Sequence, residues 1–160
     1  MLVGTTIFPR KERHADQGAG KFEFSGMPDK VPELAQEQDI WLEGQLALAK
    51  TAKHAVIFQH IPWFVADPDE PRHEYFNIDL PIRHKMLEKF KNAGVKIVFC
   101  GHYHRNGGGT DGDLEVVVTS AIGAQLGSDK HGFRVVRVLD KCIKHQYYSL
   151  DQVPKEISFE

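Results

Sequence analysis

The sequence of 160 residues contains only two cysteines, Cys100 and Cys142, and neither belongs to a Cys-x-x-Cys pair. Two cysteines are too few for a disulfide framework, which excludes a small disulfide-rich secreted protein. No apolar stretch approaches the ~20 residues that a helix needs to cross a membrane. Residues 1–9 also lack the basic start and the small-residue cleavage site of a signal peptide. We therefore expect a cytoplasmic protein without a membrane partner.

The sequence also lacks an excess of charge of one sign. Its 20 basic and 22 acidic side chains give a formal net charge of -2. Such a balance provides no broad basic surface, so we expect no nucleic acid partner. Hydrophobic residues make up 41% and charged residues 26% of the chain, which is typical of a globular domain with a core of its own.

The order of hydrophobic and polar segments predicts a layered α/β sandwich. Residues 10–33 show no hydrophobic period and are expected to form a loop or a poorly ordered arm. The spacing of Leu34, Trp41 and Leu48, with Leu42 and Ala49 beside them, predicts an amphipathic helix over residues 34–52 with these side chains on its buried face. The other expected elements are strands at 55–59, 95–100 and 115–119, a long acidic loop at 63–79, a helix between Asp79 and Gly94, and a β-hairpin at 133–139 and 142–148.

Three histidines directly follow two of the predicted strands, where ligands gather in open α/β sheets. His60 comes after residues 55–59, and His102 and His104 come after residues 95–100. In an extended chain, residues i and i+2 point to the same side ~6.5–7 Å apart, so His102 and His104 could reach two different metal ions. Neutral imidazole is a suitable ligand for Zn, Mn or Fe. The glycines at 107–109 would let the backbone approach a metal or a phosphate closely.

Each of these features has an ordinary explanation when it is taken alone. A His-x-His pair often lies on a surface, a histidine before proline is often solvated, and a glycine run is often only a turn. The combination is more informative, because each histidine motif follows a predicted buried strand. A closed structural zinc site is a further interpretation, but such sites use four ligands, usually with cysteine.

The motifs Gln59-His60-Ile61-Pro62 and Gly101-His102-Tyr103-His104 resemble the last two motifs of the calcineurin-like metallophosphoesterases. The longer run 101–106 and the segments 120–123, 127–132 and 147–150 are similar to members of this family as well. Residues 21–160 are accordingly identified as the C-terminal part of a calcineurin-like phosphoesterase domain, and residues 1–20 as an unrelated, disordered segment. The resemblance implies the C-terminal half of the family's α/β/β/α layered sandwich.

The resemblance also implies roles for individual residues and a reaction. His60 and His102 would share one metal ion and His104 would bind the other, with Arg105 and Asn106 as candidate phosphate contacts. No catalytic residue is assigned. The implied activity is metal-dependent hydrolysis of phosphate monoesters, of the protein serine/threonine phosphatase kind, with a phosphoprotein or a small phosphate ester as substrate.

The sequence departs from the family in lacking three motifs: Asp-x-His after the first strand, the aspartate of Gly-Asp, and the asparagine of Gly-Asn-His. Three neutral imidazoles cannot offset the charge of two divalent ions. We therefore expect at most one ion here (Zn, Mn or Fe), where the complete family site holds two. The alternative function is a non-catalytic fragment or pseudophosphatase that acts as an interaction module. In either case we expect a partner that covers the exposed N-terminal side of the sheet.

Overall fold

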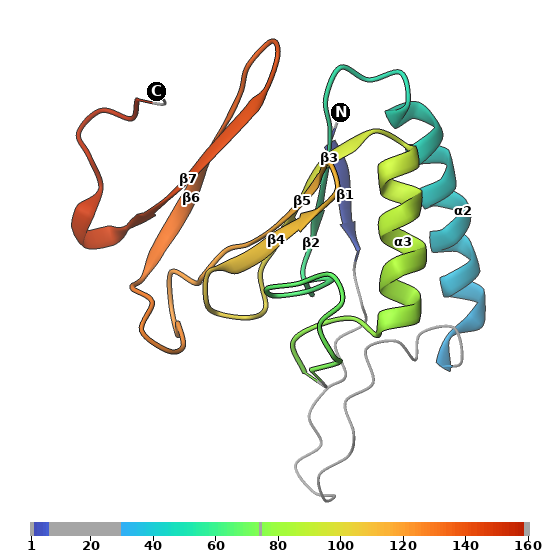
Figure 1. Cartoon of the computed structure of the whole chain (residues 1–160), viewed down its shortest axis with the longest axis horizontal. Helices are drawn as coiled ribbons and strands as arrows, with labels where there is room; N and C mark the ends of the chain where they lie inside the picture. The colour runs from blue at the N-terminus through green and yellow to red at the C-terminus, as the bar shows by residue number, and fades with distance from the viewer. Residues whose placement is uncertain (1, 7–29, 74, 159–160) are drawn as a thin grey trace, which may run out of the picture.

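The structure is a computed structural model that describes residues 2–6, 30–73 and 75–158. Its centre is a five-stranded sheet in the order β1-β2-β3-β5-β4. The first four strands in this order run parallel, and β4 closes the edge antiparallel to β5 (Figure 1). The strands are β1 (Leu2–Thr6), β2 (Ala55–Gln59), β3 (Val95–Cys100), β4 (Gly107–Asp111) and β5 (Leu114–Val118).

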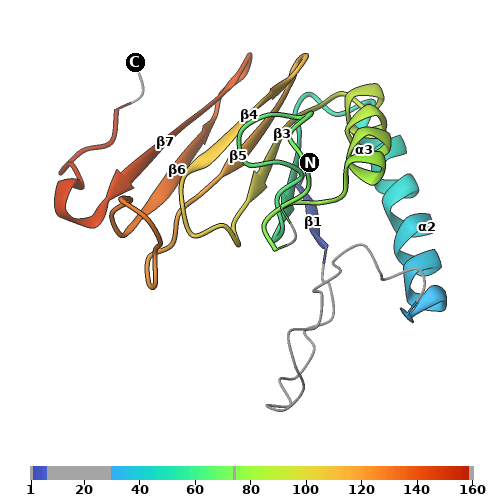
Figure 2. The same ribbon diagram turned by 60° about the horizontal axis from the view of Figure 1, so that its bottom comes forward.

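Two helices, α2 (Pro32–Ala49) and α3 (Leu80–Asn92), lie side by side on one face of this sheet (Figures 1 and 2). Leu87 and Phe90 of α3 are buried in the core against Val98 of β3. The apolar runs of β2 and β3 are buried because helices cover one face and further side chains pack on the other. Among the described residues, no helix is both long and apolar enough to span a membrane.

A separate antiparallel hairpin packs on the opposite face of the sheet. It consists of β6 (Gly132–Val138) and β7 (Ile143–Ser149), and the short 3-10 helix η1 (Leu150–Gln152) follows it. Val136 and Ile143 contact a second buried cluster made of Val56, Ile97, Phe99 and Val117. The layers are therefore helices, a five-stranded sheet and a two-stranded sheet, which confirms the predicted α/β layered architecture (Figure 2).

The structure corrects the prediction for the first helix. Leu34, Trp41 and Leu48, the expected buried face, are 46%, 42% and 58% exposed. The face that packs inward carries Leu46 and Ala49, at 4% and 2% exposed, with Leu42 packed against the same core. Ala49 and Leu42 were expected on the buried face, whereas Leu46 was not. At ~100° per residue, Leu46 lies roughly a third of a turn or more around the helix from Leu34, Trp41 and Leu48, and Leu42 and Ala49 lie in between. The seven-residue spacing was a genuine stripe, but it does not face the core.

Part of the segment expected to be disordered is a strand. Within residues 1–20, Leu2–Thr6 form β1, which pairs in parallel with β2 and covers that strand's edge. Residues 1 and 7–20 lie outside the described residues.

The glycine run at 107–109 is also different from the expected turn, because it forms the edge strand β4. A Cβ on Gly107 or Gly109 would lie 2.6 Å from the carbonyl oxygen of Val65 or 2.8 Å from that of Ala66. The backbone that approaches closely is thus the loop at residues 63–79. The approach that these glycines allow in the structure is to another backbone segment, and an approach to a metal or a phosphate stays a prediction.

Candidate metal site

The parallel pairing of β2 and β3 brings two of the three predicted histidines together. Phe58 of β2 pairs with Phe99 of β3, so the two strands end at the same edge of the sheet. The ladder continues one step further, since the Gly101 N–H donates to the His60 carbonyl at 3.1 Å. His102 Nδ1 consequently lies 3.1 Å from His60 Nε2, with the ring centroids 4.9 Å apart.

The backbone at the His-x-His motif is not extended. His102 has φ 63° and His104 has φ 55°, both in the left-handed region. This conformation costs roughly 1–2 kcal/mol per non-glycine residue, and it is concentrated at ligand sites. The prediction of an extended chain at this motif is therefore wrong, and the two imidazoles owe their orientation to two left-handed residues instead.

His104 faces the segment around residue 124. Its Nδ1 lies 2.6 Å from the Ala124 carbonyl oxygen. Across residues 2–6, 30–73 and 75–158, no group of three or more His, Cys, Asp or Glu side chains could hold a metal ion. The structure thus brings His60 and His102 into contact and does not add His104 to them as a third ligand. The assignment of all three as metal ligands stays a prediction.

Burial favours the neutral form of both members of the histidine pair. It lowers the pKa of His60, and the nearby charge of His104 lowers it further. The pKa of His102 is lowered by burial first, against an opposing hydrogen bond to Tyr75, and also by the charges of His60 and His104. A neutral imidazole retains a ring lone pair, which is the form that binds metals.

Hydrogen bonds to backbone carbonyls fix which nitrogen carries that lone pair. His102 Nε2 lies 2.7 Å from the Tyr75 carbonyl oxygen, which can only accept, so Nε2 carries the proton and Nδ1 faces His60. By the same reasoning His104 donates through Nδ1 to Ala124 and leaves Nε2 as its acceptor. Histidines that bind metals usually donate their other N–H to a carbonyl or a carboxylate in this way.

The separation within the pair also suits a metal ion. Two ring nitrogens bound to one zinc ion at ~2.0–2.1 Å lie roughly 2.9–3.4 Å apart for ligand angles between ~90° and the tetrahedral value. The 3.1 Å between His102 Nδ1 and His60 Nε2 falls within this range. The residues present therefore fit a divalent ion held by two imidazoles.

The structure distinguishes the two candidate phosphate contacts. The Arg105 guanidinium lies 4.9 Å from the Tyr103 ring centre and 5.7 Å from that of Phe76, and no carboxylate pairs with it in the described part of the chain. The side-chain oxygen of Asn106 instead accepts from Arg134 at 3.2 Å and from the Ser120 N–H at 3.4 Å. Arg105 thus keeps donors for an anion, whereas the Asn106 oxygen links β6 to the neighbouring loop.

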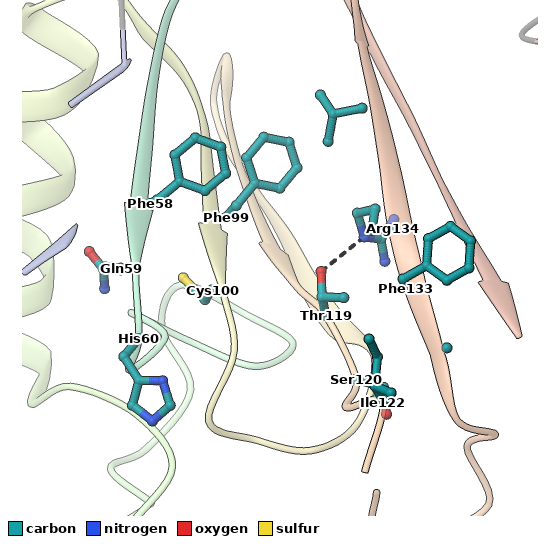
Figure 3. A pocket seen from close by; sticks show the side chains of 12 residues that line it. Phe58, Gln59, His60, Phe99, Cys100, Thr119, Ser120, Ile122, Phe133 and Arg134 are labelled. Carbon is teal, nitrogen blue, oxygen red and sulfur yellow. Dashed lines mark hydrogen bonds between the residues drawn. The ribbon is translucent and has the colours of Figure 1, made fainter. Parts of the chain in front are cut away.

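A cavity of about 470 Å³, lined by His60, lies between the five-stranded sheet and β6 (Figure 3). His60 lies at one end of it, and the stacked rings of Phe58 and Phe99 line the main sheet's side, with their centroids 5.3 Å apart. Arg134 faces them from β6 and donates to Thr119 at 3.1 Å. Phe58 is 38% exposed, so this inner face of the sandwich is only partly covered.

The backbone carbonyl groups of Tyr75 and Ala124 are the site features that sequence reasoning missed. Both residues contribute a carbonyl oxygen rather than a side chain, and a carbonyl leaves no residue-type signal in a sequence. The only available indication was the aromatic content of the loop at residues 63–79, to which Tyr75 belongs.

Comparison with known proteins decides the family, although no family model matches the chain. The human protein named serine/threonine-protein phosphatase CPPED1 is 51% identical over 136 residues, which cover 84% of this chain and 43% of that protein. The zebrafish (Danio rerio) protein of the same name is 48% identical over 134 residues, covering 82% and 42%. The chain belongs to the calcineurin-like phosphoesterase family. It spans less than half the length of these curated relatives of that family.

A solved structure supports the fold of this calcineurin-like phosphoesterase chain. GAP50 of Plasmodium, described as the anchor in the inner membrane complex, superposes with a TM-score of 0.57 at 17% sequence identity. The match covers 77% of this chain and 42% of GAP50. At this level of identity the likeness establishes a shared fold alone, and it agrees with a partial metallophosphoesterase sandwich.

Proposed function

We propose that His60 and His102 bind one divalent metal ion, and that the chain supplies this part of the centre of a metal-dependent phosphoesterase. The observation that carries the proposal is the 3.1 Å separation of His102 Nδ1 and His60 Nε2, two nitrogens whose lone pairs can meet at one ion. The carbonyl of Tyr75 supports it by holding the proton on the far nitrogen of His102. His104 would serve a second ion in a complete centre.

The proposed substrate is a phosphate monoester, on a phosphoprotein or a small molecule. The names of the relatives, serine/threonine-protein phosphatases, support this class. A divalent ion at the pair would supply Lewis-acid stabilisation of the phosphoryl oxygens. Arg105 would contact the phosphate, because its guanidinium adjoins His104 in sequence, lies over two aromatic rings and retains donors.

The chain by itself is proposed to bind at most one ion, of Zn, Mn or Fe, and to turn over phosphate esters slowly. Two neutral imidazoles bring no negative charge to offset a second cation. A partner segment that supplies carboxylates would complete the centre. The partly covered inner face beside the cavity, where Phe58 is exposed, is the surface on which we expect that segment to pack.

Isothermal titration calorimetry with Zn²⁺ and Mn²⁺ tests the metal proposal. We expect one site per chain and at least a tenfold loss of affinity in His60→Asn and in His102→Asn. His84→Asn is the matched control, because His84 is exposed and pairs with Asp69 on the outside of α3. Equal affinity in the wild type, His60→Asn and His102→Asn would reject the proposed site.

A non-catalytic interaction module is the second candidate function. It is favoured by the lack, among the described residues, of any cluster of three or more metal-binding side chains. Turnover of p-nitrophenyl phosphate with added Mn²⁺ or Zn²⁺ separates the two. Metal-dependent turnover that is lost in His102→Ala would reject the module, whereas no turnover together with metal binding would favour it.

A further inference from the structure

Arg83 of α3 is a fully buried cation whose hydrogen bonds all go to the loop at residues 63–79. Its Nε and Nη2 donate to the Ile78 carbonyl at 3.2 and 2.8 Å, and Nη1 donates to the carbonyls of Pro68 and Glu70, each at 2.8 Å. The side chain is 0% exposed. A buried charge is strongly unfavourable unless it is hydrogen-bonded, so these bonds tie the middle of the loop to its end.

The acidic residues of the loop complete this arrangement. Glu70 accepts the backbone N–H groups of Val65, Ala66 and Asp67 at 2.8, 2.9 and 3.1 Å. It also accepts from the buried Asn77 side chain at 2.6 Å. Burial lowers the pKa of Arg83, and the negative charges of Glu70, Asp69, Asp79 and Asp67 act against that shift. The acidic side chains of the loop thus help to stabilise the cation beneath it.

The organised loop presents Tyr75 and Phe76 to the histidine motif. The Tyr75 carbonyl accepts from His102 Nε2 at 2.7 Å, and the Tyr75 ring lies 4.7 Å from the His102 ring. Phe76 packs edge-on against Tyr103, with ring centroids 5.1 Å apart. Tyr75 is only two residues from Asn77, whose side-chain oxygen accepts the His73 N–H at 2.7 Å. The hydrogen bonds around Arg83 and Glu70 therefore determine where the Tyr75 carbonyl lies.

We propose that Arg83 is a positioning residue for the histidine site: it holds the loop so that the Tyr75 carbonyl fixes the orientation and tautomer of His102. Lysine cannot replace it, because its single nitrogen cannot occupy the positions of the three guanidinium nitrogens that donate to these carbonyls. The consequence for metal binding rests on the proposed function. The consequence for the tautomer of His102 does not.

The direct test is NMR of the imidazole nitrogens in the metal-free chain, at a pH above the imidazole pKa values. We expect His102 to be protonated at Nε2 in the wild type and to become a mixture of tautomers in Arg83→Lys. Lys89→Met is the matched control, because Lys89 lies on the same helix but pairs with Glu43 of α2. It should keep the wild-type tautomer.

Glu70→Gln is a second variant that leaves Arg83 in place. A glutamine retains one acceptor oxygen, so it loses part of the set of N–H groups that Glu70 now accepts from residues 65–67 and 77. It should also mix the tautomers of His102, and it keeps the test available if Arg83→Lys does not fold. If the variants that fold keep His102 protonated at Nε2 alone, the proposal is wrong.

Zinc affinity provides the second readout and separates the two proposals. Loss of a group that orients a metal-binding histidine typically weakens metal affinity by about 10- to 100-fold. We expect a loss of this size in Arg83→Lys and no change in Lys89→Met. Mixed tautomers in a chain whose wild type binds no zinc would support the role of Arg83 and reject the metal site. Zinc binding by the wild type, with an unchanged His102 tautomer in the folded variants, would support the metal site and reject the role of Arg83.

Discussion

Replacing Gly108 by alanine should strongly destabilise the fold, because this glycine meets two independent constraints. Its φ is 111°, outside the region that residues with a Cβ readily adopt. An ideal Cβ would also lie 1.9 Å from the Val116 carbonyl oxygen and 2.9 Å from the Val116 carbonyl carbon, both of them backbone atoms of β5. Neither contact can be relieved by rotating a side chain, so β4 has to move away from β5.

The size of the effect can be worked from these two constraints. The unfavourable φ costs about 1–2 kcal/mol, and forcing extra atoms into a packed site costs typically 1–3 kcal/mol. Together they predict that Gly108→Ala lowers the free energy of unfolding by roughly 2–5 kcal/mol, a large fraction of the ~5–15 kcal/mol of an ordinary domain. Moving β4 would also strain the 2.7 Å hydrogen bond from the Gly108 N–H to the Val65 carbonyl.

Gly112→Ala is the control that separates the cost of the unfavourable φ from the cost of the close contact with β5. Gly112 also has a positive φ, at 60°, but a Cβ there would meet nothing closer than the flexible Lys91 side chain at 4.0 Å. Gly112→Ala should therefore lower the free energy of unfolding only by the ~1–2 kcal/mol that the unfavourable φ costs. Urea denaturation followed by tryptophan fluorescence measures both variants. Equal losses in Gly108→Ala and Gly112→Ala would show that the close approach of β4 and β5 is not a packing constraint.

Three further predictions concern single side chains. Leu46→Ala should lower the free energy of unfolding by about 2–5 kcal/mol, and Leu48→Ala by less than ~0.5 kcal/mol. The reason is that Leu46 is 4% exposed and Leu48 is 58% exposed. A larger loss in Leu48→Ala than in Leu46→Ala, measured by urea denaturation, would contradict the orientation of α2. Cys142 should react with a thiol reagent in the native protein and Cys100 only after unfolding, because Cys142 is exposed whereas burial strongly raises the pKa of the Cys100 thiol. Equal rates of modification of the two cysteines, followed by mass spectrometry, would argue against the placement of β3. Burial acts to raise the pKa of Glu70, but hydrogen bonds from Val65, Asn77, Asp67 and Ala66 lower it. The Glu70 carboxylate therefore stabilises the fold fully at a pH above its pKa in the unfolded chain. This contribution is lost as the pH falls through the lower pKa of Glu70 in the folded chain. Glu70→Gln should thus be less stable than the wild type at neutral pH, with a difference that narrows in acid; a constant difference across the titration would rule out this role.

Some elements of the fold were predictable because their residues leave a local signal. Residues 55–59 and 95–100 are short apolar runs bounded by polar residues or glycine, and both are strands with the predicted bounds. The second helix begins and ends within a residue or two of its prediction. The Asp79 side chain, which precedes this helix, makes no capping hydrogen bond, and its carboxylate pairs with Arg72 at 2.7 Å.

Other features were not predictable, because they depend on what lies opposite a residue. The stripe of Leu34, Trp41 and Leu48 has the period of a buried helix face, but only the position of α3 and the sheet decides which face is covered. The run at 107–109 contains no strand-forming side chain, and it is a strand because its backbone pairs with β5. The surroundings, β5 and the loop at 63–79, leave room there for nothing larger than glycine.

The sequence by itself determined that His60, His102 and His104 follow two strand ends, and parallel pairing made a common edge the expected place for them. Only the tertiary structure decided that His60 and His102 form a pair while His104 turns toward Ala124. The physical reason is that orientation depends on the left-handed backbone of residues 102 and 104 and on carbonyl acceptors in distant loops. A carbonyl oxygen is the same in every residue, so its position can be known only from the fold.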